Sequence, residues 1–283
     1  MNNQVKKNLI DKSFQYFGLF CTFFGLLMLA IFIGSILIDG LGRLDWDFIT
    51  SLPSRKAAKA GILPALAGTA WIMVCTGLIA IPMGISAGVY LEEYSKKTTF
   101  GKFVEMNITN LAGVPSIIYG LLGIELFVRI LNMGGSILAG SFTLALLILP
   151  IIIVSTREAV KAVPKSIREA SYALGASKLQ TVGMAVLPSA MGGILTGVII
   201  ALSRAVGEAA PLIVIGALAY VPFVPDGPMS EFTVLPIQIF NWVSRPQHEF
   251  LINASAAIIV LLGITFLLNS IAIYLRLKKR VEY

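Results

Sequence analysis

Residues 137–156 read ILAGSFTLALLILPIIIVST, a run of 20 positions without a charged side chain. An α-helix rises about 1.5 Å per residue, so such a run spans roughly the 30 Å hydrocarbon core of a bilayer. The whole chain has a similar character, since 57% of its 283 residues are hydrophobic and 13% are charged. Soluble domains have about 45–50% and about 25%, respectively. The run therefore indicates a transmembrane helix in a protein built for lipid.

Five further segments have the length and apolar character of a membrane-spanning helix. The six predicted spans are residues 17–38, 65–91, 108–131, 137–156, 189–220 and 253–275. The first is too long for the apolar core of a secretory signal, which has about 7–15 residues. No stretch suggests a separate soluble domain. The sequence thus predicts an all-α integral membrane protein with six transmembrane helices in a single domain over residues 1–283.

The basic residues indicate how these helices are oriented. An even number of spans puts both termini on one side of the membrane. The tails and loops of that side, 92–107 and 157–188 among them, carry 15 Lys and Arg residues, whereas the opposite loops carry six. The positive-inside rule then places both termini in the cytoplasm. We interpret the net charge of +7 as this topology signal and not as a surface for nucleic acid.

Few side chains suggest catalysis, metal binding or a disulfide. Cys21 and Cys75 lie inside long apolar runs, and His248 is the one histidine of the sequence. No cluster of Cys, His or carboxylate residues accompanies His248, so it does not indicate a metal site. Motifs of membrane-embedded enzymes, such as His-Glu-x-x-His, are missing from the spans. We expect no catalytic residue, metal or cofactor in this chain.

The loop between the fourth and fifth spans has an ordered pattern of its own. Pro164 suits the first turn of a helix, and Gly175 can end that helix in a left-handed conformation. Ser177 and Gln180 have the spacing of a capping box, which starts a second helix running towards Pro188. The pattern predicts two helices joined at a glycine corner and projecting from the membrane.

A spaced motif runs through this loop. Its positions are Glu169, Ala170, Ser171, Gly175, Ala185, Leu187 and Pro188. It resembles the EAA loop of ABC importer permeases, whose pattern is Glu-Ala-Ala, three residues, Gly, nine residues, Ile, one residue, Leu-Pro. Ser171 replaces the third small residue and Ala185 the isoleucine, and both keep the position small or apolar.

The resemblance implies the type I, MetI-like fold of ABC importer permeases. It also implies that this loop is a coupling helix seated in a groove of the ATPase subunit. The residues expected to contact that subunit are Glu169, Ala170, Ser171 and Gly175. An amphipathic helix that lies on the membrane surface without a partner is the alternative.

Four other stretches resemble the permeases of phosphate importers, namely residues 81–94, 113–120, 205–212 and 233–242. The last is similar to the PstA type of the two phosphate permeases and not to its PstC-type partner. The resemblance implies a PstA-type subunit of a phosphate-specific ABC importer in the bacterial inner membrane. It further implies a PstC-type second permease, an extracytoplasmic PstS-type phosphate-binding protein, and a PstB-type ATPase dimer that binds ATP and Mg. The sequence has no Gly-x-x-x-x-Gly-Lys-[Ser/Thr] loop, so a separate subunit must hydrolyse ATP.

Arg204 and Glu208 form the deepest ionisable pair of the predicted spans. A charge at mid-bilayer costs about 2.5–3.5 kcal/mol, so both side chains should face the bundle interior or a polar cavity. They share a helix face at i and i+4, and Gly207 with Pro211 marks a break in the same apolar run. Guanidinium binds phosphate through bidentate bonds, which makes Arg204 the candidate anion contact. We expect Glu208 to neutralise Arg204 when the pathway is empty; accepting a hydrogen bond from the proton of phosphate is its alternative role. A structural ion pair that joins helices is the alternative.

Two outer features have simpler interpretations. Glu125 and Arg129 repeat the i, i+4 spacing near the end of the third span, where a solvated ion pair is expected. In the outer loop, Leu235, Ile239 and Trp242 recur at helical spacing. They are typical of a short helix in the membrane interface with Trp242 as its anchor. A docking surface for an extracytoplasmic partner is also compatible with this loop.

Other classes of transporter fit the sequence less well. A secondary transporter would also bury an Arg-Glu pair, but many such proteins contain inverted repeats, and the two halves of this chain show none. Within the importers, a permease for molybdate, sulfate or polyamine is the alternative to one for phosphate.

Overall fold

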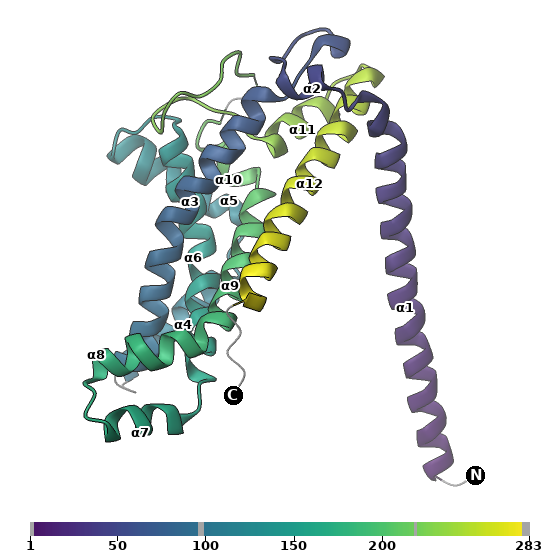
Figure 1. Cartoon of the computed structure of the whole chain (residues 1–283). Helices are drawn as coiled ribbons and strands as arrows, with labels where there is room; N and C mark the ends of the chain where they lie inside the picture. Colours follow the sequence, from purple (N-terminus) through teal and green to yellow (C-terminus); the bar gives the residue numbers. More distant parts are fainter. Residues whose placement is uncertain (1–2, 96–98, 218–219, 279–283) are drawn as a thin grey trace.

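The structure is a computed structural model that describes residues 3–95, 99–217 and 220–278. Five of its helical stretches are long and apolar enough to cross a membrane (Figure 1). These stretches are Asp11–Arg43, Leu63–Tyr94, Ile137–Lys161, Lys178–Val206 and His248–Tyr274. A bent pair of helices, counted as one span, supplies the sixth. The predicted all-α membrane architecture is confirmed.

The predicted span at 108–131 is not one straight helix. In its place, α4 (Thr99–Leu111) and α5 (Ser116–Gly123) meet at a bend of 104°. Pro115 caps α5 in an extended conformation, and a proline also disfavours helical geometry at the residue before it. The apolar run therefore breaks here, and a π-helical segment, η4 (Ile124–Ile130), continues α5 beyond the break.

The fifth predicted span, 189–220, begins earlier than expected. α8 (Lys178–Thr181), the π-helical η5 (Val182–Val186) and α9 (Leu187–Val206) follow one another without a gap. Pro188 lies inside this continuous run, directly after the π-helical η5, where its missing N–H removes one i→i−4 hydrogen bond. The second helix of the loop at 157–188 is thus continuous with the helix counted as a candidate span from Lys178 to Val206.

The same predicted span also ends sooner than expected. Gly207 caps the end of α9, and the short α10 (Ala210–Val214) follows. The break predicted from Gly207 and Pro211 is confirmed, but its cause differs. Pro211 lies in the first turn of α10, where no helical N–H is needed, and not inside a longer helix. Residues 218–219 of the predicted span lie outside the described residues.

Small residues bring α3 (Leu63–Val89) close to α6 (Ile137–Lys161). A Cβ on Gly84 would lie 2.5 Å from Cγ2 of Ile152, and one on Gly88 would lie 2.7 Å from Cβ of Thr156. Glycines four residues apart share one helix face and let two backbones approach closely in lipid. Together with α9, these two helices enclose the largest cluster of buried apolar side chains that the structure describes.

The outer loop packs onto the rest of the chain and buries its tryptophan. The short elements of this outer cap are η1 (Leu41–Arg43), α2 (Trp46–Thr50), η2 (Ala57–Lys59) and α11 (Leu235–Val243). Trp242 is 1% exposed. Its ring lies 5.9 Å from that of Phe48 and 6.3 Å from that of Phe250, between centroids. The prediction of Trp242 as an interfacial anchor is therefore wrong, because its aromatic area is buried within the protein.

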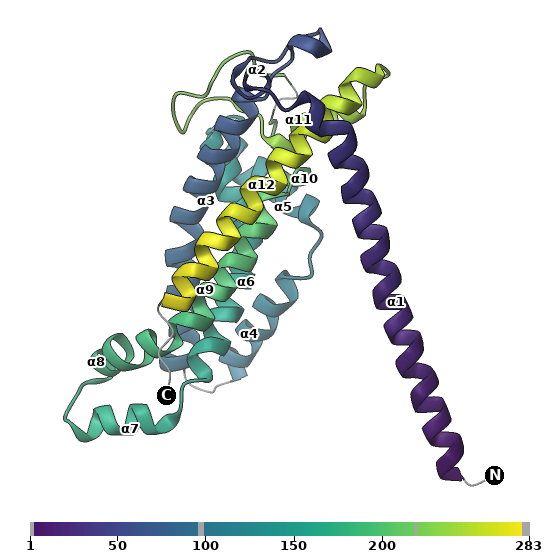
Figure 2. The ribbon, with the colours of Figure 1, turned by 45° about the vertical axis from the view of Figure 1, so that its right-hand side comes forward.

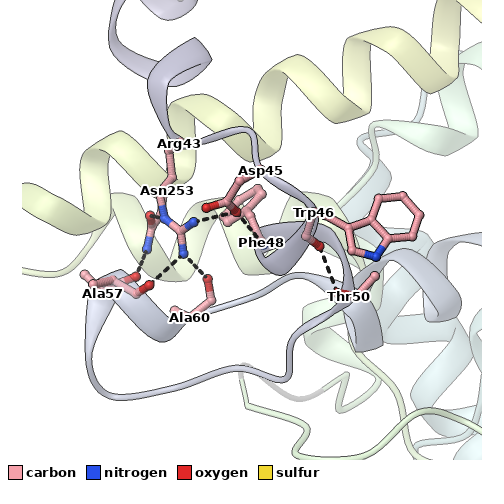
Figure 3. A network of polar contacts seen from close by, with 9 residues as sticks. Arg43, Asp45, Trp46, Phe48, Thr50, Ala57, Ala60 and Asn253 are labelled. Carbon is pink, nitrogen blue, oxygen red and sulfur yellow. Dashed lines mark hydrogen bonds and ion pairs between the residues drawn. The ribbon is translucent and has the colours of Figure 1, made fainter.

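Arg43 joins the end of the first span to this outer cap (Figure 3). Its guanidinium donates to the carbonyls of Ala58 and Ala60 and to the side-chain oxygen of Asn253. It also forms an ion pair of 2.9 Å with Asp45. Asn253 belongs to the last helix, α12 (His248–Lys278), so one side chain connects the first and the last helical stretches of the chain.

The first helix, α1 (Asn3–Gly40), stands apart from the bundle over most of its length (Figures 1 and 2). It meets α12 near Gly40, where an added Cβ would lie 2.7 Å from the backbone nitrogen of Ala256. Further along the helix its apolar side chains are exposed in the single chain, as Phe20 is at 63%. This surface is available to lipid or to another membrane protein.

Candidate functional site

The predicted glycine corner follows α7 (Lys165–Ala173), which lies at the end of the molecule opposite the outer cap (Figure 1). Gly175 has a φ of 81°, in the left-handed region that favours glycine. The Gly175 N–H donates to the Tyr172 carbonyl and the Ala176 N–H to the Ser171 carbonyl. These two bonds are those of a Schellman motif, which satisfies the last carbonyls of a helix. The corner is thus fixed by backbone geometry.

The second half of the loop is fixed by side chains. The Ser177 hydroxyl accepts from the Gln180 N–H, and the Gln180 side chain accepts from the Ser177 N–H, so the predicted capping box is confirmed. The hydroxyls of Ser171 and Thr181 are 2.9 Å apart and hydrogen-bonded. Ser171, the position that departs from the EAA pattern, therefore joins α7 to α8 across the corner. An alanine could not make this bond.

The loop exposes apolar side chains around the corner. Glu169, Ala170 and Gly175 are exposed, whereas Ser171 is partly covered. The large apolar side chains beside them are Tyr172, Leu174, Leu179 and Met184, exposed at 44, 89, 74 and 79%. A rigid polar loop that displays several large apolar side chains is typical of a protein–protein docking surface. We call these four side chains together with the corner the docking face.

An ion pair that the sequence analysis missed holds the loop against the bundle. Arg168, next to Glu169, reaches Glu93 just beyond the C-terminal end of α3, with Nη2 and Oε1 2.7 Å apart. Arg168 also donates to the carbonyls of Val160 and Val163 at the end of α6. The adjacent carboxylates Glu92 and Glu93 are visible in the sequence. Their arginine partners could not be identified there, because they are distant in the chain.

Arg204 and Glu208 lie at the junction of α9 and α10. Arg204 Nε and Glu208 Oε1 are 3.3 Å apart, and the two side chains are 39 and 19% exposed. The predicted pairing is therefore present, and the more exposed partner of the pair is Arg204. Arg204 lies on the surface of the single chain because Ala201 and Ala205, which flank it on α9, take the buried face.

Close packing holds the α9–α10 junction against α5. A Cβ on Gly120 would lie 2.8 Å from Cα of Pro211 and 2.9 Å from Cβ of Val214. Leu212 of α10 is 1% exposed and anchors the other face of the short helix in the core. The α10 side of the break is therefore held tightly against α5 and the core.

The remaining residues discussed in the sequence analysis are an exposed ion pair and two cysteines. Glu125 and Arg129 form an ion pair of 2.9 Å, with side chains 57 and 67% exposed. This exposure agrees with the predicted solvated pair. Cys21 and Cys75 are both free thiols.

The bundle and its projecting loop have the fold of an ABC importer permease. The chain superposes on a solved structure of the MetNI methionine ABC transporter in an inward-facing conformation, with a TM-score of 0.62 and 19% identity. The match covers 78% of this chain and 98% of that chain.

The sequence matches the family model of binding-protein-dependent transport system inner membrane components over residues 80–283. The chain belongs to this family. It is 33% identical over 280 residues to a probable ABC transporter permease protein, YqgI, of Bacillus subtilis, covering 94% of each chain. It is 35% identical over 242 residues to the phosphate transport system permease protein PstA of Haemophilus influenzae, covering 84% of each. It is 32% identical to PstA of Yersinia pestis, covering 91% of this chain and 86% of that one.

Proposed function

We propose that this chain is the PstA-type permease subunit of an ATP-driven importer that moves inorganic phosphate into the cytoplasm. The observation that carries the proposal is the similarity to proteins named PstA over most of the chain, at 32 and 35% identity. The rigid, exposed docking face supports it, because a permease needs a surface on which the ATPase can act. ATP and Mg are bound by that PstB-type ATPase dimer and not by this chain.

The remaining partners follow from the same proposal. A PstC-type permease completes the pathway, and a PstS-type binding protein delivers phosphate at the outer cap. Glu169, Ala170, Ser171 and Gly175 belong to the face that meets the ATPase. The excess of basic residues places this face and both termini in the cytoplasm. Lys96, Lys97, Lys279 and Arg280, which contribute to the excess, lie outside the described residues.

Arg204 is the proposed phosphate contact of this subunit. Its guanidinium is 39% exposed in the single chain, so it is available to an anion at a seam between two permeases. Glu208 holds the guanidinium when no anion is present, and phosphate competes for the same donors. An arginine used only to join helices of this chain would instead be expected to contact a second helix, and the charged partner of Arg204 is four residues away.

Phosphate uptake into proteoliposomes that contain the whole importer tests this role. We expect Arg204→Gln to abolish phosphate uptake without affecting assembly. Uptake by Arg204→Lys should be only slightly higher, because an ammonium lacks the planar fork of guanidinium. Arg129→Gln is the matched control, since it removes an exposed arginine from a similar i, i+4 pair. Recovery of uptake in the double variant Arg204→Gln, Glu208→Gln would show that the pair is structural and that Arg204 does not contact phosphate.

Competition identifies the substrate. Excess unlabelled phosphate should suppress uptake of labelled phosphate, whereas sulfate, molybdate and a polyamine should not. Suppression by one of these three would assign the importer to that ligand. Transport that continues without the ATPase subunit would indicate a secondary transporter.

A further inference from the structure

The turn at the cytoplasmic end of α3 contacts three other elements through side chains. This turn, η3 (Tyr90–Tyr94), is π-helical, a geometry found frequently at functional sites. Its adjacent carboxylates point to different partners. Glu92 pairs with Arg157 of α6, with Oε2 and Nε 3.2 Å apart, and Glu93 pairs with Arg168 of α7. One turn of helix thus holds both a membrane span and the loop at 157–188 that carries the docking face, which we call the docking loop.

The contact with the docking loop is well enclosed for a pair near the membrane surface. The side chain of Glu93 is 9% exposed and that of Arg168 is 17% exposed. Arg168 uses Nε and Nη2 for Glu93, and Nη1 and Nη2 for the carbonyls of Val163 and Val160. Because its donors are shared between α3 and the end of α6, α7 is difficult to displace without moving both.

The second helix of the loop is attached to the same turn. The Lys178 ammonium lies 4.8 Å from the centre of the Tyr94 ring, within the range of a cation–π contact. Lys178 is the first residue of α8. Both halves of the docking loop therefore meet η3, through Glu93 and through Tyr94.

The other carboxylate of the turn extends the connection to α4. Arg157 pairs with Glu92 and also with Glu105 of α4, whose Oε1 lies 2.6 Å from Nη1. α4 ends at Leu111, and the Leu111 carbonyl accepts a hydrogen bond of 2.7 Å from the Tyr119 hydroxyl of α5. α5 is the helix that packs against the α9–α10 junction beside Arg204.

We propose that Glu92 and Glu93, with Arg157 and Arg168, are positioning residues that convey a displacement of the docking loop to α3 and α4. The inference rests on the proposed function, because it assumes that an ATPase moves the loop. A push on α7 reaches Glu93 through Arg168. Since Glu92 lies on the same turn, the push reaches Arg157 and then Glu105. Breaking either pair should leave hydrolysis of ATP intact but reduce the transport obtained from it.

The assay uses the whole importer in proteoliposomes, with phosphate uptake and ATP hydrolysis measured on the same samples. Glu92→Gln and Glu93→Gln remove one charge each with little change of shape. Glu158→Gln is the matched control, because Glu158 is an exposed carboxylate at the same end of α6, paired with Lys161. Glu93→Arg combined with Arg168→Glu restores the pair with its charges exchanged.

We expect the number of ATP molecules hydrolysed per phosphate to rise at least about fivefold in Glu92→Gln and Glu93→Gln, and to stay within about twofold of wild type in Glu158→Gln. The KM for phosphate should not change, because Glu92 and Glu93 pair with other arginines and not with Arg204. The exchanged pair should recover part of the coupling. An unchanged ratio in both single variants would overturn the proposal. Loss of ATPase binding in Glu93→Gln would also overturn it, since the pair would then only shape the docking face.

A second measurement does not depend on the substrate. Spin labels are placed at Met106 of α4 and Ile200 of α9, both 57% exposed, after replacement of Cys21 and Cys75. The distance between the labels should change on trapping with ATP and vanadate in wild type, and should change at most half as much in Glu92→Gln. An equal change in both would overturn the relay. If the wild-type importer takes up no phosphate but this difference is present, the proposed substrate fails and the relay stands.

Discussion

Replacing Gly175 tests whether the shape of the corner sets the affinity of the permease for its ATPase. An added Cβ at Gly175 would have no heavy atom within 4 Å, so a side chain there meets no clash. The penalty is therefore conformational, about 1–2 kcal/mol for a non-glycine residue at a left-handed φ. Alanine should lie at the lower end of this range, and valine at the upper end because of its β-branch. Asparagine adopts this conformation more readily and should cost little.

We expect the corner of a variant to relax to a right-handed conformation in the free permease, so that binding has to restore the left-handed one. The penalty then appears in the dissociation constant, where each 1.4 kcal/mol is a tenfold change. We expect the dissociation constant for the ATPase subunit to rise about 5-fold in Gly175→Ala and about 30-fold in Gly175→Val. Gly175→Asn should stay within about twofold of wild type. Membrane insertion should not change, because the corner lies outside the spans.

The affinity is measured by titrating the ATPase subunit onto the permease pair in nanodiscs with biolayer interferometry. Gly183→Ala is the matched control. Gly183 is likewise exposed with open space around it, but it lies in the helical η5. Equal affinities for Gly175→Ala and Gly183→Ala would refute the argument, because the left-handed corner would then have no influence on binding.

Three further predictions concern packing and topology. A Cβ on Gly123 would lie 2.9 Å from Cγ2 of Thr143, so Gly123→Ala should destabilise the purified protein by about 1–3 kcal/mol, and Thr143→Ala should relieve much of this in a thermal-shift assay. Arg43→Ala leaves the side-chain oxygen of Asn253 without its donor, so the free energy of unfolding should fall by about 1–3 kcal/mol and the melting temperature should fall with it. A melting temperature equal to that of wild type would show that the Arg43 network does not contribute to stability. An impermeant thiol reagent should label Gly227→Cys but not Lys178→Cys in intact cells, and labelling of the latter would contradict the orientation.

Local chemistry in the sequence predicted the docking loop well. The left-handed Gly175 and the capping box of Ser177 and Gln180 depend on residues within a few positions of each other, and the structure contains both. The bend before α5 was missed, although Pro115 signals it, because the apolar run on either side is long enough for a span. A hydropathy pattern records how apolar a segment is and not where its backbone turns.

Contacts between segments that are distant in the chain could not be predicted from the sequence. Glu93 and Arg168 are 75 residues apart, and no periodicity connects them. Trp242 was misassigned for the same reason, since a tryptophan in an outer loop suits the membrane interface unless other segments cover it. The exposure of Arg204 likewise depends on which helix face the bundle buries. Such facts require the packing of several helices to be known.

The contact of Arg43 with Asn253 has a consequence for the order of biosynthesis. The two residues are 210 positions apart, and at about 5–20 residues per second the ribosome needs roughly 10–40 s to proceed from one to the other. During that interval α1 is already made, while the helix to which it will be joined is not. The first helix therefore has to remain in the membrane as a separate unit, and it is attached to the rest of the chain among the last steps of assembly.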